Sequence, residues 1–149
     1  MSNTPERTNA MHHADKLLHG NLLAIDPSST SLGFAIFHKG VFVEKGVKKY
    51  KGDIAFRLHM IFMDVFKLNQ EADADIVAIE RLRSSGGYSP PQLMWSVGAV
   101  LAAISPLPML EVSPNSWKVV AREEGLAKSD ENDAYCIGKR IIDKAEEFR

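Results

Sequence analysis

The segment LLAIDPSSTSLGFAIF, residues 22–37, contains two apolar runs separated by a short polar stretch. The first run, residues 22–26, has the apolar character of a strand and ends in an acid, and the turn-forming residues 27–31 follow it. Residues 33–37 form the second run, and a turn at residues 38–40 leads to a third strand over residues 41–50. Local hairpins of this kind predict a three-stranded antiparallel meander.

Downstream of this meander, helical and strand-like patterns alternate. Apolar residues recur at helical spacing over residues 54–68, whereas the short β-branched run DIVAIE at residues 75–80 is typical of a buried strand. The segments expected after it are a helix at 92–104, a strand at 109–112, a helix from Ser113-Pro114 to Gly125 and a last helix capped by Ser129. We therefore expect an α/β fold with a five-stranded mixed sheet, three strands antiparallel and two parallel, flanked by helices.

Composition favours one soluble domain. The chain has 149 residues, of which 45% are hydrophobic, and this suffices for one core. We expect residues 1–20, which are polar and rich in His, to be a flexible leader, and residues 21–149 to be a single domain. Cys136 is the single cysteine and no apolar run approaches the roughly 18 residues that span a bilayer, so we expect no membrane association and a cytoplasmic protein. A phage protein acting in the host cytoplasm, or an organellar protein, also fits.

The overall charge of the chain does not indicate whether it binds nucleic acid. The 18 Lys and Arg residues nearly cancel the 19 Asp and Glu residues, so any nucleic-acid binding depends on local patches.

Four acidic residues stand at positions that suit a functional site. Asp26 and Glu80 each end an apolar strand, and Asp130 and Asp133 are three residues apart at the start of the last predicted helix. Taken singly, an Asp before Pro starts turns and an Asp near a helix N-terminus is favoured by the helix dipole. Together, converging carboxylates repel one another unless cations offset their charge, and oxygen ligands suit Mg²⁺ or Mn²⁺. Two such ions can hydrolyse a phosphodiester without a protein nucleophile.

Four motifs in order carry a family resemblance. Residues 22–37 resemble a first strand and hairpin with the pattern I-D-P-[GS]-x-x-x-x-G, and VAIERL at 77–82 resembles a second acidic motif. SPNSWKVVAREEGLAK at 113–128 resembles a stretch with two functional lysines, and DENDA at 130–134 is similar to a final D-x-x-D-A. The family is the RuvC-type Holliday junction resolvases, of the ribonuclease H-like superfamily.

This resemblance implies a site and a reaction. It implies catalytic, metal-binding roles for Asp26, Glu80, Asp130 and Asp133. Lys118 and Lys128 match the two functional lysines, which would steady charge developing on the phosphate. The expected cofactor is two Mg²⁺ ions per site, with Mn²⁺ as a substitute. The expected enzyme is an endonuclease, a homodimer that resolves four-way DNA junctions by paired symmetric nicks.

Basic and aromatic residues near these acids are candidate DNA contacts. Arg81, Arg83 and Arg122, with Lys118 and Lys128, would grip phosphates; ordinary solvated surface charge is the alternative interpretation, and the motif match favours a function for the two lysines. Tyr88, in a Gly-rich loop, is a candidate for stacking on an unpaired base.

Two departures from the family pattern concern the DNA-binding surface. Only Ser129 separates Lys128 from Asp130, where family members usually carry a helix. Family members also tend to have an aromatic residue shortly after the second acid, which is Glu80 here. In this chain Arg81, Leu82 and Arg83 follow Glu80 instead.

Three other interpretations stay open at this point. The chain could be a nuclease of the same fold that acts on flaps, on RNA/DNA hybrids or on branched DNA in general. An actin-like or sugar-kinase fold also has a strand-end Asp followed by Ser, Thr and Gly, but it needs two such domains to enclose a nucleotide. The third is a non-catalytic DNA-binding module.

Overall fold

The computed structural model describes residues 4–81 and 90–149, which form one central sheet with helices on both sides. The strands are β1 (Asn21–Pro27), β2 (Ser31–His38), β3 (Val41–Lys49), β4 (Ile76–Glu80) and β5 (Met109–Val112). The helices are α1 (Pro5–His12), α2 (Ala14–His19), α3 (Ile54–Ala72), α4 (Pro91–Ile104), α5 (Pro114–Glu124) and α6 (Asp130–Glu146).

The sheet confirms the predicted mixed topology. Its strand order is β3-β2-β1-β4-β5. β1, β2 and β3 pair antiparallel as the hairpins predict, and β4 and β5 add parallel to β1. In this register Ile25 lies beside Ile79, so the next residue of each strand, Asp26 and Glu80, stands at the same edge of the sheet.

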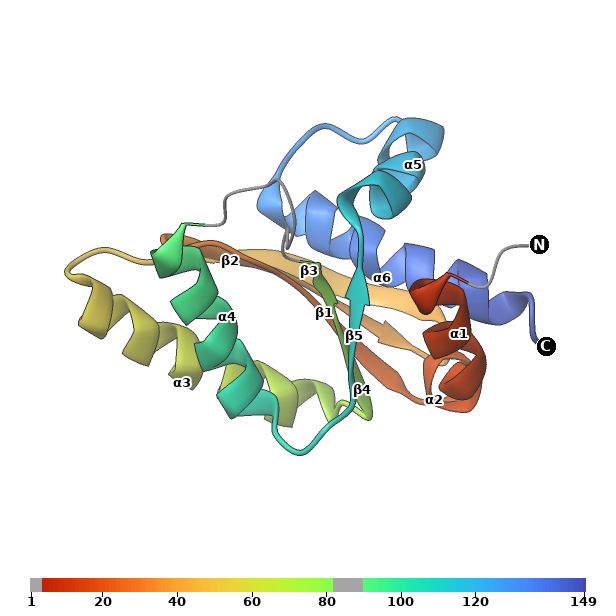
Figure 1. Ribbon diagram of the computed structural model, residues 1–149, viewed down its shortest axis with the longest axis horizontal. Coiled ribbons are helices and arrows are strands. Elements are labelled where there is room, and N and C mark those ends of the chain that lie inside the picture. The colour runs from red at the N-terminus through yellow and green to blue at the C-terminus, as the bar shows by residue number, and fades with distance from the viewer. Residues whose placement is uncertain (1–3, 82–89) are drawn as a thin grey trace.

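Helices cover the two faces of the sheet with separate apolar clusters (Figure 1). α3 and α4 pack on one face, where buried residues such as Ile25, Ile61 and Val100 make up one cluster. α6 lies along the other face together with α5, α1 and α2, and its apolar side chains form the second cluster. The inner face of α6 is apolar, since Ala134, Ile137, Ile141 and Ile142 are all buried.

The prediction of a flexible leader over residues 1–20 is wrong for the part that the structure describes. α1 and α2 pack against α6, and Ala10, Leu17 and Leu18 belong to the core. Glu6 is buried, accepts a hydrogen bond from the backbone N–H of Ser113 (2.5 Å) and lies 3.8 Å from Lys144. These contacts across the fold, rather than a strong helical pattern, hold the segment in place.

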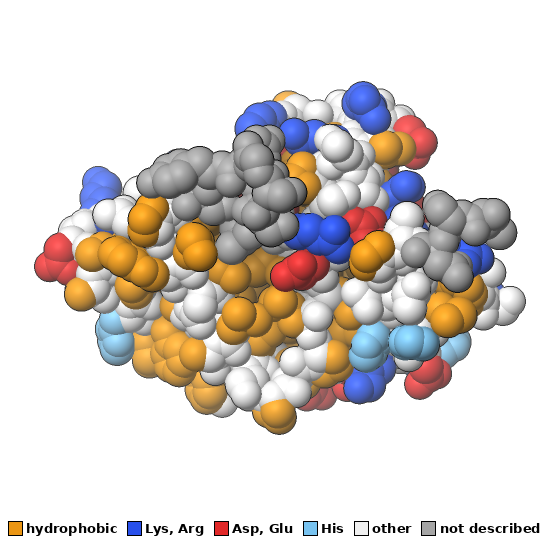
Figure 2. Space-filling model, viewed as in Figure 1, with side chains coloured by type: hydrophobic (Ala, Val, Ile, Leu, Met, Phe, Trp, Pro, Cys, Tyr) orange, Lys and Arg blue, Asp and Glu red, His pale blue; other side chains and the backbone are white. Residues whose placement is uncertain are grey.

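The outer face of α3 and α4 is unusually apolar. Trp95 of α4 is 51% exposed, whereas Trp117 of α5 is buried. Among residues 4–81 and 90–149, nothing lies within 4 Å of the β-carbon position of Gly98. Figure 2 shows hydrophobic side chains gathered over these two helices. The exposed apolar residues on them are Phe56, Met63, Phe66, Met94, Trp95 and Leu101.

No helix within residues 4–81 and 90–149 has the length and hydropathy of a membrane span.

Candidate active site

The sheet places the first two acids side by side. Asp26 near the end of β1 and Glu80 at the end of β4 are partly buried, and their carboxyl groups share a hydrogen bond. Parallel strands present their carboxyl ends at one edge, which is where ligand sites of α/β folds gather. The predicted pairing of these two acids is therefore present in the structure.

The N-terminus of α6 brings the other two acids to the same edge. The Ser129 side chain caps α6 by accepting from the backbone N–H of Asn132 (3.1 Å), so Asp130 and Asp133 lie in the first turn. Gly33, which pairs with Asp26 across the β1–β2 hairpin, lies directly against the backbone of Asp130. A β-carbon at Gly33 would overlap that backbone, so glycine is what permits α6 to start this close to Asp26.

Each carboxylate has a polar partner. The hydroxyl of Ser31 donates to Asp130 Oδ2 (2.6 Å), and Lys128 Nζ donates to Asp133 Oδ2 (3.3 Å). Asp26 and Glu80 share their own hydrogen bond. Within the described residues, no three Asp, Glu, His or Cys side chains are already arranged as a metal-binding set. The acids converge on one place while their oxygens are directed to protein partners.

The electrostatics of Asp26 and Glu80 reflect the neighbouring acids. The pKa of Asp26 is raised to about 8, chiefly by burial and also by the negative charges of Glu80, Asp133 and Asp130. Burial also raises the pKa of Glu80, with Asp133 adding to the shift, while Lys118 and Lys128 oppose it. The site therefore carries excess negative charge, which is the condition that favours bound cations.

The two predicted lysines flank the acids from α5 and from the loop before α6. Lys118 and Lys128 line a pocket of about 120 Å³ that also reaches Asp133. The ion pair with Asp133 raises the pKa of Lys128, whose side chain is otherwise 84% exposed. Trp117 lies beneath Lys118, and the lysine ammonium is 5.8 Å from the indole ring centre. Both lysines therefore lie close enough to the acids to lower the pKa of Glu80 by their charge.

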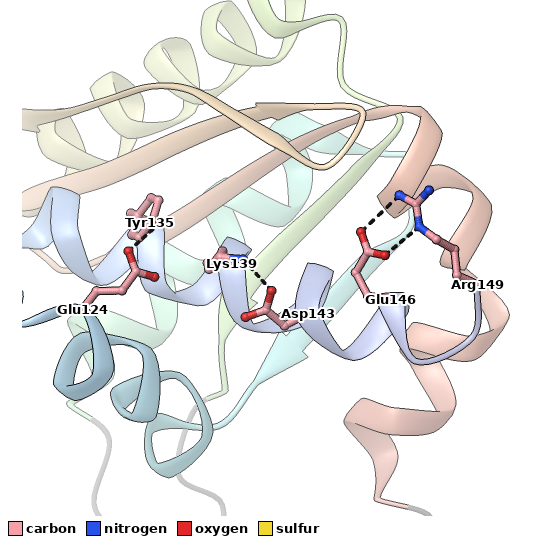
Figure 3. Close-up of polar contacts among 6 residues, drawn as sticks. All are labelled: Glu124, Tyr135, Lys139, Asp143, Glu146 and Arg149. Atoms are coloured by element: carbon pink, nitrogen blue, oxygen red, sulfur yellow. Dashed lines mark hydrogen bonds and ion pairs between the residues drawn. The ribbon is translucent and has the colours of Figure 1, made fainter.

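Polar contacts fix α5 and α6 relative to each other. Tyr135 of α6 donates its hydroxyl to Glu124 at the end of α5 (2.9 Å), as Figure 3 shows. Near the start of α5, Arg140 Nε donates to the hydroxyl of Ser116 (3.0 Å). Because α5 is tied to α6 at both ends, the position of Lys118 depends on the helix that carries Asp130 and Asp133.

The arginines and the tyrosine predicted to contact DNA lie in different places. Arg81 follows Glu80 directly, pairs with Glu111 at 3.5 Å and lines a pocket of about 400 Å³ with Arg140 and Lys144. Arg122 is exposed in the last turn of α5, and the described part of the chain gives it no ion pair with the acids. Arg83 and Tyr88 lie outside the described residues.

Sequence reasoning missed three residues that position this site: Gly33, Ser31 and Glu6. Gly33 was visible in the family-like pattern, but nothing in the sequence indicates that it meets Asp130. Ser31 reads as a turn residue, and Glu6 as part of a leader. Each acts on a residue far away in sequence, which local patterns do not reveal.

Comparison with solved structures shows which fold this is. RuvC of Thermus thermophilus in complex with a Holliday junction substrate superposes with a TM-score of 0.68 at 22% identity, over 82% of this chain and 92% of that one. The chain has the RuvC-type ribonuclease H fold. A second Thermus thermophilus RuvC structure gives a TM-score of 0.64 at 21% identity, over 86% and 93% of the two chains. The yeast mitochondrial Holliday junction resolvase Ydc2 gives 0.57 at 13% identity, over 98% and 97%.

No family model and no curated protein sequence matches the chain. At these identities the structural likeness establishes the fold, including the expected ribonuclease H-like sheet, and the function is argued from the site.

Proposed function

We propose that this chain is a metal-dependent endonuclease that resolves four-way DNA junctions. The observation that carries the proposal is the meeting of Asp26, Glu80, Asp130 and Asp133 from β1, β4 and α6, in a fold shared with a resolvase bound to its junction. A covalent route through Cys136 is disfavoured, because Cys136 is fully buried in the core and has a pKa raised to about 11, chiefly by burial.

The donor set fits two Mg²⁺ ions, with Mn²⁺ as a substitute. All four candidate ligands are carboxylates, the hard oxygen donors that these ions prefer. The hydrogen bond between Asp26 and Glu80, the Ser31 contact of Asp130 and the Lys128 contact of Asp133 would be exchanged for cations. When bound there, such ions supply Lewis acidity toward the phosphodiester and lower the pKa of water.

The side chains of the site have different roles. Asp26 and Glu80 hold the centre of the site because both come from rigid, buried strands. Asp130 and Asp133 face them from a helix whose start is fixed by Gly33. Lys118 and Lys128, beside the pocket at Asp133, neutralise charge that develops on the phosphate oxygens.

We also propose a twofold homodimer formed through α3 and α4. A junction has twofold symmetry, so paired cuts on opposite strands require two sites related in the same way. The exposed apolar side chains of α3 and α4, Trp95 and Phe66 among them, form a surface that a monomer would leave in water (Figure 2). Light scattering should give twice the chain mass, and Trp95→Glu should give a monomer.

A substrate panel tests the activity. Labelled immobile junctions, flaps, RNA/DNA hybrids and plain duplexes are incubated with Mg²⁺, Mn²⁺ or EDTA. We expect metal-dependent nicking of the junction and none by Asp26→Asn, whose binding to junctions should persist. Equal cutting of flaps or hybrids would replace junction resolution by a broader nuclease activity, and DNA binding without any cutting would indicate a non-catalytic module.

A further inference from the structure

One face of β3 points toward the candidate active site. β3 is the edge strand of the sheet, and nearly all of its residues are exposed. The pairing of β3 with β2 shifts register between Ile36 and Phe37, and this shift determines which side chains of the rest of β3 point to each face of the sheet. Lys45, Val47 and Lys49 then lie on the side of α6, whereas Gly46 lies over Phe34 on the side of α3 and α4.

This face of β3 and the start of α6 enclose a groove of about 460 Å³. The groove is lined by Val47, Lys49, Lys128, Ser129, Asp130 and Glu131. Two of these residues, Lys128 and Asp130, also belong to the candidate active site. A molecule lying in the groove is therefore in contact with the edge of that site.

Two lysines on this face of β3, Lys49 in the groove and Lys45 beside it, are available to an anion. Lys45 Nζ donates to the side-chain oxygen of Asn132 (2.6 Å) and lies 5.7 Å from the Tyr135 ring centre, so its ammonium is held against α6 by neutral groups. Within the described part of the chain, the side chain of Lys49 has no hydrogen bond or ion pair. The opposing charges are those of Asp130, which accepts from Ser31, and Glu131.

We propose that this groove, together with Lys45 beside it on the same face of β3, binds the DNA backbone on one side of the scissile phosphate, with Lys45 and Lys49 contacting phosphate groups. The inference rests on the proposed function and deepens it, since it assigns the path of the strand that the site cuts. Four residues of extended strand separate the two lysines by about 13 Å, which is enough to contact more than one phosphate of a strand. The negative charge of Asp130 repels a phosphate least when bound cations offset it. Binding of the DNA strand and binding of metal ions should therefore strengthen each other.

Lys48 provides a matched control. It belongs to the same exposed strand and carries the same charge, but it pairs with Leu32 and alternates to the face opposite Lys49. Lys49→Ala, Lys45→Ala/Lys49→Ala and Lys48→Ala are compared by the anisotropy of a labelled four-way junction over a range of salt concentrations, and by steady-state cleavage.

We expect the double variant to bind the junction roughly three- to tenfold more weakly, and its plot of log K against log[salt] to be shallower by about 0.9 for each lost phosphate contact. KM should rise while kcat stays near the wild-type value, and Lys48→Ala should match wild type in each respect. Unchanged melting temperatures would show that the fold is intact.

Suppose that the wild type cleaves junctions, and that the double variant binds them with the wild-type affinity and salt slope. This result would overturn the inference about the groove and leave the proposed function standing. That outcome, accompanied by self-association, would show that the lysines only protect the sheet edge. A wild type that binds DNA through Lys49 without cutting junctions would overturn the proposed function alone, and one that binds no DNA would overturn both.

Discussion

Gly33 of β2 lies against the backbone of Asp130 at the start of α6, in a space that no β-carbon could share. Asp26 pairs with Gly33 across the hairpin, so one contact relates a strand-borne acid to the helix-borne pair. Gly33→Ala should displace the start of α6, lower junction cleavage at least tenfold and destabilise the fold by about 1–3 kcal/mol, the usual cost of overpacking.

Thr30→Ala is the control for this variant, because Thr30 is exposed in the neighbouring turn. Cleavage rates and urea unfolding of both variants check the prediction. Wild-type cleavage by Gly33→Ala would mean that the position of α6 does not matter for activity.

Asp26→Asn should make the metal-free protein more stable while abolishing cleavage. Because its pKa is raised, the folded chain must either keep this partly buried carboxyl protonated or bear its repulsion with Glu80, Asp130 and Asp133, and an amide avoids both costs. A gain of about 1 kcal/mol would raise the Tm of a chain of this size by about 2–4 °C. Thermal melts with EDTA or Mg²⁺ measure it: Mg²⁺ should stabilise wild type more than the variant. Equal Mg²⁺ stabilisation of both would contradict the metal assignment of Asp26.

Glu6→Ala should loosen the attachment of α1 to the rest of the fold. Glu6 accepts from the backbone N–H of Ser113 and pairs with Lys144, and its removal leaves both without this partner. We expect a loss of about 1–3 kcal/mol in the free energy of unfolding, the cost of an unsatisfied buried group. Glu123→Ala, an exposed acid on α5, should change stability little. If the two variants unfold alike, α1 contributes no such contact.

Tyr50→Phe should flatten the loss of stability at alkaline pH. Burial of Tyr50 raises its pKa well above the usual value, and its hydrogen bond to Asp64 (2.9 Å) adds to the shift. Above about pH 10 the unfolded chain releases this proton and the folded chain keeps it, so stability falls by up to about 1.4 kcal/mol per pH unit from this residue. Below that pH its contribution is fully present.

Urea unfolding of wild type and Tyr50→Phe from pH 8 to pH 11 measures the difference between the two slopes. The variant should lose about 1 kcal/mol at pH 8 through the missing hydrogen bond. It should then converge on wild type as the pH rises. Parallel curves would mean that Tyr50 ionises as readily in the folded protein as in the unfolded one.

The sequence predicted the sheet well because its signals are local. Hairpin turns at residues 27–31 and 38–40 determine the antiparallel pairs, and the short run before Glu80 indicates a buried strand. α1 and α2 escaped prediction because α1 is mostly polar and Leu17 and Leu18 become core residues only through contact with distant elements. Local pattern carries no information on such packing.

The same distinction applies to the site. Asp26, Glu80, Asp130 and Asp133 could be found because acids at strand ends and at a helix start are conspicuous. The contacts that position them, such as Ser31 with Asp130, join residues 99 positions apart and emerge only in the folded chain.

Cleavage of a supercoiled plasmid that extrudes a cruciform tests the central claim most directly, because the product reports both the substrate and the pairing of cuts. If this chain is a dimeric junction resolvase, wild type with Mg²⁺ should yield linear plasmid cut at symmetric positions across the cruciform, and Asp26→Asn should leave the plasmid supercoiled. Nicked circles without linear product, or equal cutting of a plasmid that lacks the cruciform, would contradict the account.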